Sequence, residues 1–442
     1  MRLLIKNGLV VTMNEAREII KTDILIEEDR ILALGDDLKE TRIDQSINAD
    51  GMLVIPGLIQ SHIHLCQVLF RGLADDLELL DWLKQRIWPL EAAHDQDTLY
   101  YSALLGCAEL IRGGTTAIID MGTVQHSDSL FQAVKKAGLR YLGGKCLMDQ
   151  SADLPPGLSD NTDKAINESL DLVKRWDGAE QGRLRYALCP RFAVSCSAVL
   201  LDQVRDISET LNLPVHTHAS ENKGEVELVR SLTGLPNITY FNEKGLCNER
   251  LIVAHCIHLS GEEINLLAES GSHIAHCPSA NLKLASGFAP IPRLLERGAD
   301  VSLGADGAPC NNQLSAFMEM RLAALIHKPA YGPRAMPAGQ VFEMATRGGA
   351  RAMGLETETG SLEPGKKADL ALVKLEAWHH YPLDAASAYG HLVYQASASD
   401  VFATIVDGRI LMMDNRLLTL DADELRRGIG RSLQTVRQRT GI

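Results

Sequence analysis

The chain lacks several features that would place it in common classes of protein. No stretch of its 442 residues approaches the ~18 consecutive apolar residues of a membrane span. It has 44 basic against 57 acidic residues, and the formal net charge of −13 argues against nucleic acid and against an anionic membrane as partners. The first residues lack the long apolar segment and cleavage site of an export signal. We therefore expect a cytoplasmic protein that acts on a small molecule.

Paired cysteines are also missing. The nine cysteines include no Cys-x-x-Cys pair, and their odd number speaks against a disulfide framework. Several lie inside apolar runs, namely Cys66, Cys189, Cys256 and Cys277. Cysteines in such runs are typically small, buried side chains of a protein in a reducing cytoplasm.

What is present is an alternation of apolar, strand-like runs with segments of helical period. The predicted strands are 53–60, 115–121, 140–146, 184–190, 212–218, 251–256, 272–276 and 300–306. Eight strands alternating with helices predict an α/β protein built on a (β/α)8 TIM barrel. An open doubly wound sheet is the alternative, but the glycine-rich phosphate loop of that fold is absent.

The two ends of the chain have a different, strand-and-turn character. Short strands separated by turns fill residues 1–56, and the same character returns over 361–420, before a closing helix in 421–442. Each β-rich end is too small to fold well alone. We therefore expect both ends to pair into one small, discontinuous β-sandwich domain beside a barrel that occupies 57–360.

Four polar fragments each follow an apolar run, where a predicted strand ends. They are Ser61-His62-Ile63-His64, His216-Thr217-His218-Ala219-Ser220-Glu221, Ala254-His255-Cys256 and Gly304-Ala305-Asp306-Gly307. Barrel enzymes keep their chemistry at the C-terminal ends of their strands. Three imidazoles and a carboxylate, from His62, His64, His218 and Asp306, would bind a divalent metal and leave room for a water. The pattern predicts a metal-dependent hydrolase.

Two further side chains are candidates for proton transfer. Glu221 lies three residues after His218, where it would protonate a ring nitrogen and then the leaving amine. His255 would take a proton from the attacking water together with Asp306, and a role as a fifth metal ligand is the alternative. The role of His276, at the end of the seventh predicted strand, stays open.

These motifs, in this order, resemble the amidohydrolase superfamily, specifically its mononuclear aminohydrolase branch. The resemblance covers nearly the whole chain, including Pro56-Gly57-Leu58-Ile59-Gln60-Ser61-His62-Ile63-His64 and Gly360-Ser361-Leu362-Glu363-Pro364-Gly365-Lys366-Lys367-Ala368-Asp369. It implies the same four metal ligands, the same two catalytic residues, and a metal that is usually zinc and sometimes iron. Binuclear members carry a lysine at the end of the fourth strand. Since that lysine is missing here, we expect one divalent metal.

The resemblance gives two answers about the substrate. Three stretches resemble deaminases of 5′-deoxyadenosine, methylthioadenosine and S-adenosylhomocysteine. They are the segment from Arg71 through Trp82 to Glu91, the run Asn281-Leu282-Lys283-Leu284-Ala285-Ser286-Gly287, and the stretch from Asn311-Asn312 to Glu319-Met320-Arg321. By that match Trp82 would bind substrate and Glu91 would accept hydrogen bonds from the ribose hydroxyls, unless it forms a helix-end salt bridge.

Other residues resemble guanine deaminase instead. They are Gln67, the Pro190-Arg191-Phe192 run followed by Ser195-Cys196, and the His-Ala-Ser-Glu-Asn run at 218–222. By that match Gln67 and Arg191 would read the edge of the purine, because a guanidinium offers planar donors to a ring carbonyl or nitrogen. A structural salt bridge is the alternative for Arg191.

Together the patterns predict a metal-dependent hydrolytic deaminase of a purine ring, which releases ammonia from an adenine nucleoside. A guanine or pterin deaminase, an s-triazine amino- or chlorohydrolase, and a non-enzymatic metal-binding barrel are the alternatives. Glu221 favours deamination, since a chloride leaving group needs no proton. Related proteins are often dimers or tetramers, so a homo-oligomer is expected.

Overall fold

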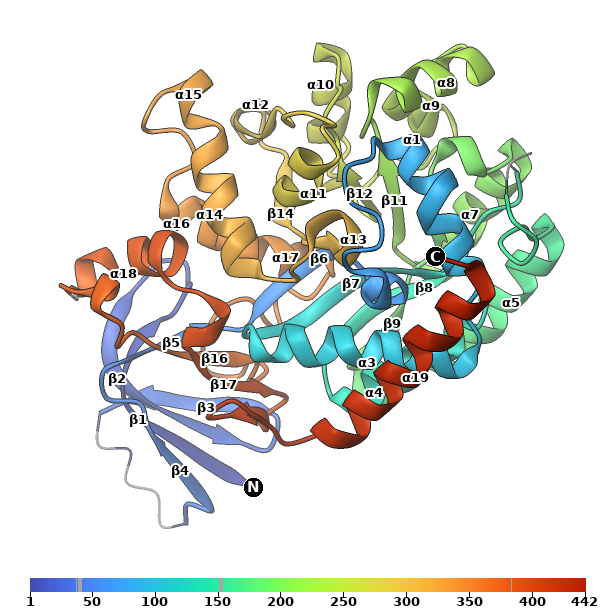
Figure 1. The fold of residues 1–442 in the computed structure, drawn as a ribbon. Coiled ribbons are helices and arrows are strands. Elements are labelled where there is room, and N and C mark those ends of the chain that lie inside the picture. The colour runs from blue at the N-terminus through green and yellow to red at the C-terminus, as the bar shows by residue number, and fades with distance from the viewer. Residues whose placement is uncertain (37, 39–41, 151–153, 383) are drawn as a thin grey trace.

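The computed structural model describes residues 1–442 except 37, 39–41, 151–153 and 383. Within that range the strands form three sheets, two of them parallel, and most helices pack around the parallel pair (Figure 1). Helices alternate with the parallel strands along the chain. The α/β class predicted from the sequence is therefore confirmed.

Both ends of the chain contribute to a single sheet at one side of the molecule (Figure 1). Among the described residues its nine strands run in the order β19-β18-β17-β16-β5-β1-β2-β3, with β4 beside β1. Their bounds are β1 (Arg2–Val11), β2 (Ile19–Glu27), β3 (Arg30–Gly35), β4 (Gln45–Asn48), β5 (Met52–Pro56), β16 (Leu370–Lys374), β17 (Val401–Val406), β18 (Arg409–Met413) and β19 (Arg416–Leu417). The two ends meet where β5 and β16 pair antiparallel, with Val54 opposite Leu372.

The two parallel sheets carry the middle of the chain. One has the order β10-β8-β7-β6-β15 with β9 beside β8, and the other the order β11-β12-β13-β14. The bounds are β6 (Leu58–His64), β7 (Thr115–Thr123), β8 (Arg140–Leu147), β9 (Leu184–Tyr186), β10 (Cys189–Pro190), β11 (Val215–Ala219), β12 (Leu251–His255), β13 (His273–His276), β14 (Asp300–Leu303) and β15 (Asp306–Gly307). Every residue of β6, β7 and β8 is buried, as expected of parallel strands covered on both faces.

The two parallel sheets touch along both of their edges. On one side the isolated parallel bridges Leu188↔Val215 and Phe192↔His218 join them. On the other side the Ser61 hydroxyl, on β6, donates to the Leu303 carbonyl of β14 at 2.9 Å. The carboxyl ends of strands from both sheets therefore face one common region.

The predicted strand 53–60 is in fact two strands that belong to different sheets. β5 ends at Pro56 and pairs in the terminal sheet, whereas β6 begins at Leu58 and pairs with β7. Gly57 lies at the crossing, where a Cβ would come 2.0 Å from Thr116 Oγ1. Only glycine fits that close approach.

The helices are mostly short and cover the parallel sheets. The longer ones are α3 (Gln96–Arg112), α4 (Ser127–Ala137), α5 (Thr162–Trp176), α7 (Ala198–Leu211), α8 (Lys223–Thr233), α10 (Gly261–Glu269), α14 (Ala316–Ile326) and α19 (Ala422–Thr440). The shorter ones include α1 (Leu79–Trp82), α2 (Trp88–Ala92), α9 (Asn237–Glu243), α11 (Pro278–Lys283), α12 (Ile291–Glu296), α13 (Ala308–Asn311), α15 (Lys328–Tyr331), α16 (Ala338–Glu343), α17 (Gly349–Ala352) and α18 (Ala388–Gly390). The predicted closing helix is α19, which Asp421 caps and which lies beside α3 (Figure 1).

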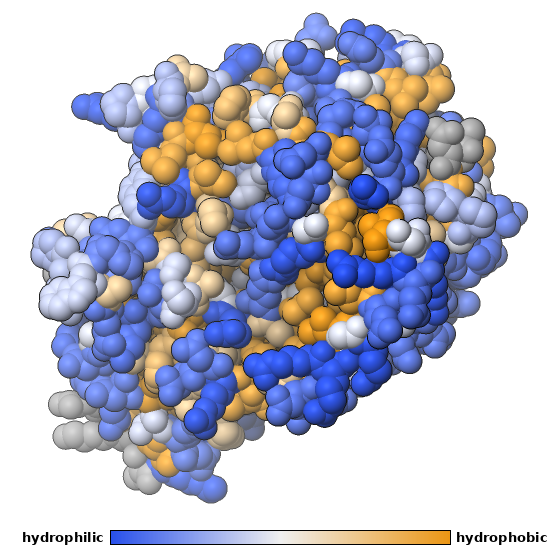
Figure 2. Space-filling model, in the orientation of Figure 1, coloured by the Kyte–Doolittle hydropathy of each residue, from blue (hydrophilic) through white to orange (hydrophobic). Residues whose placement is uncertain are grey.

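The face of the molecule seen in Figure 2 is largely hydrophilic, and apolar side chains gather toward its middle. In the part of the chain that the structure describes, no helix combines the length and the apolar character needed to cross a membrane. All nine cysteines are free thiols.

Candidate metal centre and substrate pocket

The residues predicted to bind metal lie at the carboxyl ends of strands from both parallel sheets. His62 and His64 are on β6, two apart, so their side chains leave the same face of the strand. His218 is on β11 and Asp306 is the first residue of β15. Asp306 has a left-handed backbone, with a φ of 63°, which is uncommon for a residue other than glycine. The fold thus brings these four side chains to one place.

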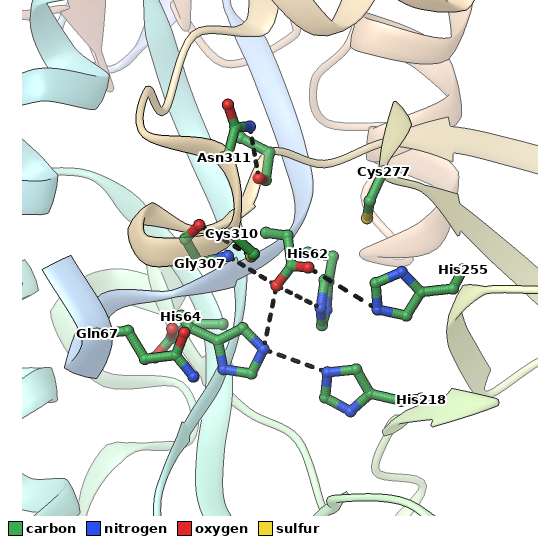
Figure 3. A network of polar contacts seen from close by, with 12 residues as sticks. His62, His64, Gln67, His218, His255, Cys277, Gly307, Cys310 and Asn311 are labelled. Atoms are coloured by element: carbon green, nitrogen blue, oxygen red, sulfur yellow. Dashed lines mark hydrogen bonds and ion pairs between the residues drawn. The ribbon is translucent and has the colours of Figure 1, made fainter. Parts of the chain in front are cut away.

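Their polar atoms converge (Figure 3). Asp306 Oδ1 lies 3.4 Å from His62 Nε2 and 3.4 Å from His64 Nε2. The Nε2 atoms of His64 and His218 are 3.2 Å apart. The set of His62, His64 and His218 and the set of His62, His255 and Asp306 each bring one ligand atom per residue within 4.8 Å of one another. Such a cluster fits one divalent ion bound by nitrogen and oxygen ligands.

In three histidines the Nδ1 atom, which is the ring nitrogen opposite the Nε2 that faces the cluster, contacts the surrounding protein. His62 Nδ1 meets His216 Nε2 at 2.9 Å, His218 Nδ1 meets the Arg191 carbonyl at 2.6 Å, and His255 Nδ1 meets Asn281 Oδ1 at 2.8 Å. Among the described residues, the buried Nε2 atoms of His62 and His255 have no hydrogen-bond partner. Outer contacts of this kind fix the ring orientation of metal-binding histidines.

The electrostatics favour the protonation states that bind a metal. Burial lowers the pKa of His64 and of His218 well below its ordinary value, so both imidazoles are neutral. Burial alone would raise the pKa of Asp306, but the neighbouring imidazole of His62, with those of His255 and His64, holds that pKa well below its usual range. The two neutral imidazoles of His64 and His218 therefore face a carboxylate.

The two predicted proton-transfer residues adjoin this cluster. Glu221 Oε2 lies 3.5 Å from His255 Nε2, and that nitrogen is 3.9 Å from Asp306 Oδ2. Burial raises the pKa of Glu221 well above its ordinary value, which favours the protonated carboxyl. Burial also lowers the pKa of His255 to about 4, which leaves its ring neutral. Burial thus favours the protonated form of Glu221 and leaves its neighbour His255 able to accept a proton.

Glu221 is positioned by a residue that the sequence did not single out. Its backbone N–H donates to Glu225 Oε2 at 2.8 Å, and Glu225 takes part with Asn222 in the capping box of α8. His216 and Asn281 were likewise not assigned a role from the sequence. The capping box has a sequence signature, an Asn followed three residues later by Glu, that could have identified Glu225. The contacts of His216 and Asn281 depend on the tertiary fold.

A cavity of about 30 Å³ adjoins the cluster. It is lined by His64, Gln67, Leu79, Trp82, Leu83, Arg191, Phe192, His218, Glu221, Glu225, His255 and Asp306. Three of the four predicted substrate-binding residues, Gln67, Trp82 and Arg191, are therefore in its wall. Glu91 lies behind the wall, where it bonds to two of them.

Glu91, Arg191 and Gln67 form one buried network. Arg191 Nη1 donates to Glu91 Oε2 at 2.6 Å and Nη2 to Oε1 at 3.2 Å, while Gln67 Nε2 donates to Oε1 at 2.8 Å. Glu91, which the sequence predicted to bind the sugar, and Arg191, which it predicted to bind the base, are thus paired with each other. His276 lies elsewhere, at the end of β13, with its ring 5.6 Å from that of His327.

Buried imidazoles and a carboxylate at the ends of parallel strands define a metal-binding α/β protein. The model of the amidohydrolase family matches residues 53–411, which is most of the chain. The chain therefore belongs to the amidohydrolase family.

Its relatives include several nucleoside deaminases. The 5-methylthioadenosine/S-adenosylhomocysteine deaminase of Desulforudis audaxviator is 40% identical over 431 residues, 97% of each chain. The 5′-deoxyadenosine deaminase of Methanosarcina mazei is 40% identical over 431 residues, 96% of this chain and 95% of that one. Among solved structures, a zinc-bound adenosine deaminase from Xanthomonas campestris is 30% identical, with a TM-score of 0.92 over 99% of this chain and 98% of that one.

Proposed function

We propose that this protein is a hydrolytic deaminase that converts the adenine ring of a nucleoside to its oxo form and releases ammonia. The observation that carries the proposal is the pairing of Glu221 with His255 beside the histidine and aspartate cluster. Full-length similarity to deaminases of methylthioadenosine, S-adenosylhomocysteine and 5′-deoxyadenosine supports the substrate class. Deamination replaces the C–N bond of the ring amine by a bond to the oxygen of water.

The proposed cofactor is one divalent metal, zinc or else iron, held by His62, His64, His218 and Asp306. The convergent donor atoms and the unpartnered Nε2 of His62 support this assignment. When bound, such a metal activates water as a nucleophile near neutral pH. The zinc in the Xanthomonas campestris deaminase agrees with the donor set.

The protein's own groups move the protons. His255 Nε2, together with Asp306, would accept a proton from the attacking water, because Asn281 already occupies the other ring nitrogen. Glu221 would give its proton to a ring nitrogen and then pass one to the departing amine. A positioned acid or base of this kind contributes about 10² to 10⁴ in rate.

Substrate recognition is assigned to the residues around the cavity. Gln67 Oε1 and Trp82 Nε1 are buried and have no hydrogen-bond partner among the described residues, so each has capacity for a ligand. Arg191 would face the base and Glu91 the sugar hydroxyls, with their ion pair rearranging when substrate binds. A substrate that satisfies both residues would have base and sugar together, as a nucleoside does.

We also propose the complete architecture that the family resemblance implies. The two parallel sheets, linked along both edges, would form one (β/α)8 barrel over 57–360. The sheet from both chain ends would form the β-sandwich domain of 1–56 and 361–420, with the helix of 421–442 packed on the barrel. A cytoplasmic homo-oligomer, dimer or tetramer, completes the proposal, and light scattering of the purified protein would give its mass.

The test of the activity is a substrate panel. Zinc-loaded protein is incubated with 5′-deoxyadenosine, methylthioadenosine, S-adenosylhomocysteine, guanine, a pterin and a chlorotriazine, and ammonia and chloride are measured. Ammonia from the adenine nucleosides is the expected result. Ammonia from guanine alone, or chloride from the triazine without nucleoside turnover, would replace the proposed substrate class.

A further inference from the structure

The cavity beside the metal-binding cluster is too small for any nucleoside. Its volume is about 30 Å³, and by this measure one water needs roughly 10–15 Å³. Pockets that bury a small-molecule ligand usually span about 300–1,000 Å³. The conformation is therefore a closed one, and part of the wall must move before a substrate can enter.

One segment contributes three apolar side chains to the wall of the cavity. Leu79, Trp82 and Leu83 line the cavity from α1 and from the π-helical turn η2 (Leu83–Ile87) that follows it. The other face of this segment is open, since Asp75, Asp81 and most residues between Arg71 and Glu78 are partly or fully exposed. Most of the other lining residues lie at or just after strand ends, which the sheets hold in place. The movable part is therefore the segment 71–83.

Lys283 ties this segment to the loop that follows Asp306. Its ammonium pairs with the Asp75 carboxylate, and it donates to the Pro309 carbonyl at 2.8 Å and to Asn312 Oδ1 at 2.9 Å. Asn312 Nδ2 also donates to Asp75 Oδ1 at 3.4 Å. All three donors of the ammonium are thereby used.

The three sequence stretches that resembled nucleoside deaminases meet at this one ammonium. Asp75 comes from the first stretch, Lys283 from the second, and Asn312 from the third. None of these residues lines the cavity or belongs to the metal-binding cluster among the described residues. These three side chains therefore contact one another outside the cavity, where they can affect how the segment 71–83 closes over it.

The contact with Asp75 suits a reversible closure. The side chains of Lys283 and Asp75 are 23% and 41% exposed, and ion pairs that are open to solvent contribute little to stability. The start of the segment is held more firmly, because Arg71 pairs with Glu109 and donates to the Asn312 carbonyl at 3.0 Å. The segment can therefore release at Asp75 while Arg71 stays in place.

We propose that residues 71–83 form a lid over the substrate pocket and that Lys283 is the positioning residue that holds the lid closed through Asp75. The nucleoside that enters is that of the proposed function, on which this part of the inference rests. Opening admits the substrate, and closure presents Trp82 to it and excludes bulk water.

Hydrogen–deuterium exchange of the zinc-loaded, ligand-free protein tests whether the Lys283–Asp75 ion pair, the latch, holds the lid closed. The variants are Lys283→Met and Asp75→Asn, which remove the ion pair from either side. Lys244→Met is the matched control, because Lys244 forms a similarly exposed pair with Asp202, at 18% and 42%, away from the lid. Loss of such a pair should speed exchange in peptides covering 71–83 by about two- to fivefold in both variants. The control should not change it.

Several outcomes would overturn the proposal. Exchange of the lid at the wild-type rate in both variants would show that Lys283 is no latch, and a fast, unprotected lid in the wild type would show that no closed state exists. An equal change in the control would mean a general loss of stability. In a deaminase assay, KM should rise in both variants while kcat changes less.

The proposed function can fail separately from the lid. Purine riboside, which has no amine to lose, should slow exchange of 71–83 in the wild type. If it does not, while both latch variants still speed exchange, the lid stands and the nucleoside assignment fails.

Discussion

Arg191 and Glu91 form a bidentate ion pair in the interior, with nitrogen–oxygen distances of 2.6 and 3.2 Å. Their side chains are 6% and 4% exposed, so the pair is shielded from solvent. Neither side chain can bind substrate unless the ion pair rearranges.

Breaking this pair from one side should destabilise the protein. Arg191→Met leaves the Glu91 carboxylate buried without a cationic partner, and such a loss costs about 3–5 kcal/mol. Chemical denaturation of the zinc-free protein measures it. The double variant Arg191→Met/Glu91→Gln should recover part of the loss. A double variant no more stable than the single one would contradict this account of the pair.

Replacing the carboxylic acid of Glu221 should slow turnover strongly and leave the metal in place. Glu221→Gln keeps the size of the side chain but cannot deliver a proton, so ammonia release should fall by about 10²- to 10⁴-fold. Elemental analysis should give the wild-type zinc content. Glu227→Gln, on the exposed face of α8, is the control. Full activity in Glu221→Gln would rule out the proposed acid.

The metal should be single and should stabilise the fold. Chelation should abolish ammonia release, and zinc at about 100 times its dissociation constant should restore activity and add about 2.7 kcal/mol of stability. Calorimetry and elemental analysis are the measurements, with one zinc per chain expected. His64→Asn should lose the metal, whereas His379→Asn, at an exposed histidine, should keep it. Two equivalents of tightly bound zinc would refute the mononuclear site.

Asn281 should matter through the orientation of His255. Asn281→Leu removes the oxygen that lies 2.8 Å from His255 Nδ1, and the loss of such outer contacts typically costs about 10- to 100-fold in activity or metal affinity. Asn281→Asp keeps an acceptor oxygen and should retain more activity. Steady-state kinetics together with zinc content separate the two effects. Equal kcat values in both variants would show that the contact does not orient the ring.

Much of the site could be predicted from the sequence because its residues lie at the ends of recognisable strands. His62 and His64 are two apart, so any β-strand places both on one face. Glu221 follows His218 closely enough that a strand end and a turn bring both to the same rim. The break of the predicted strand 53–60 into two strands at Gly57 was missed, because an apolar run does not reveal that its two halves pair in different sheets.

The sequence by itself determined the candidate metal ligands, the candidate proton donor and the alternation of strands and helices, all of which depend on residue type and short-range spacing. Only the tertiary structure decided that Arg191 pairs with Glu91, 100 positions away, and that Lys283 reaches Asp75, 208 positions away. Contacts between segments that are distant along the chain depend on how the sheets and loops pack in space. The local periodicity of the sequence does not predict that packing.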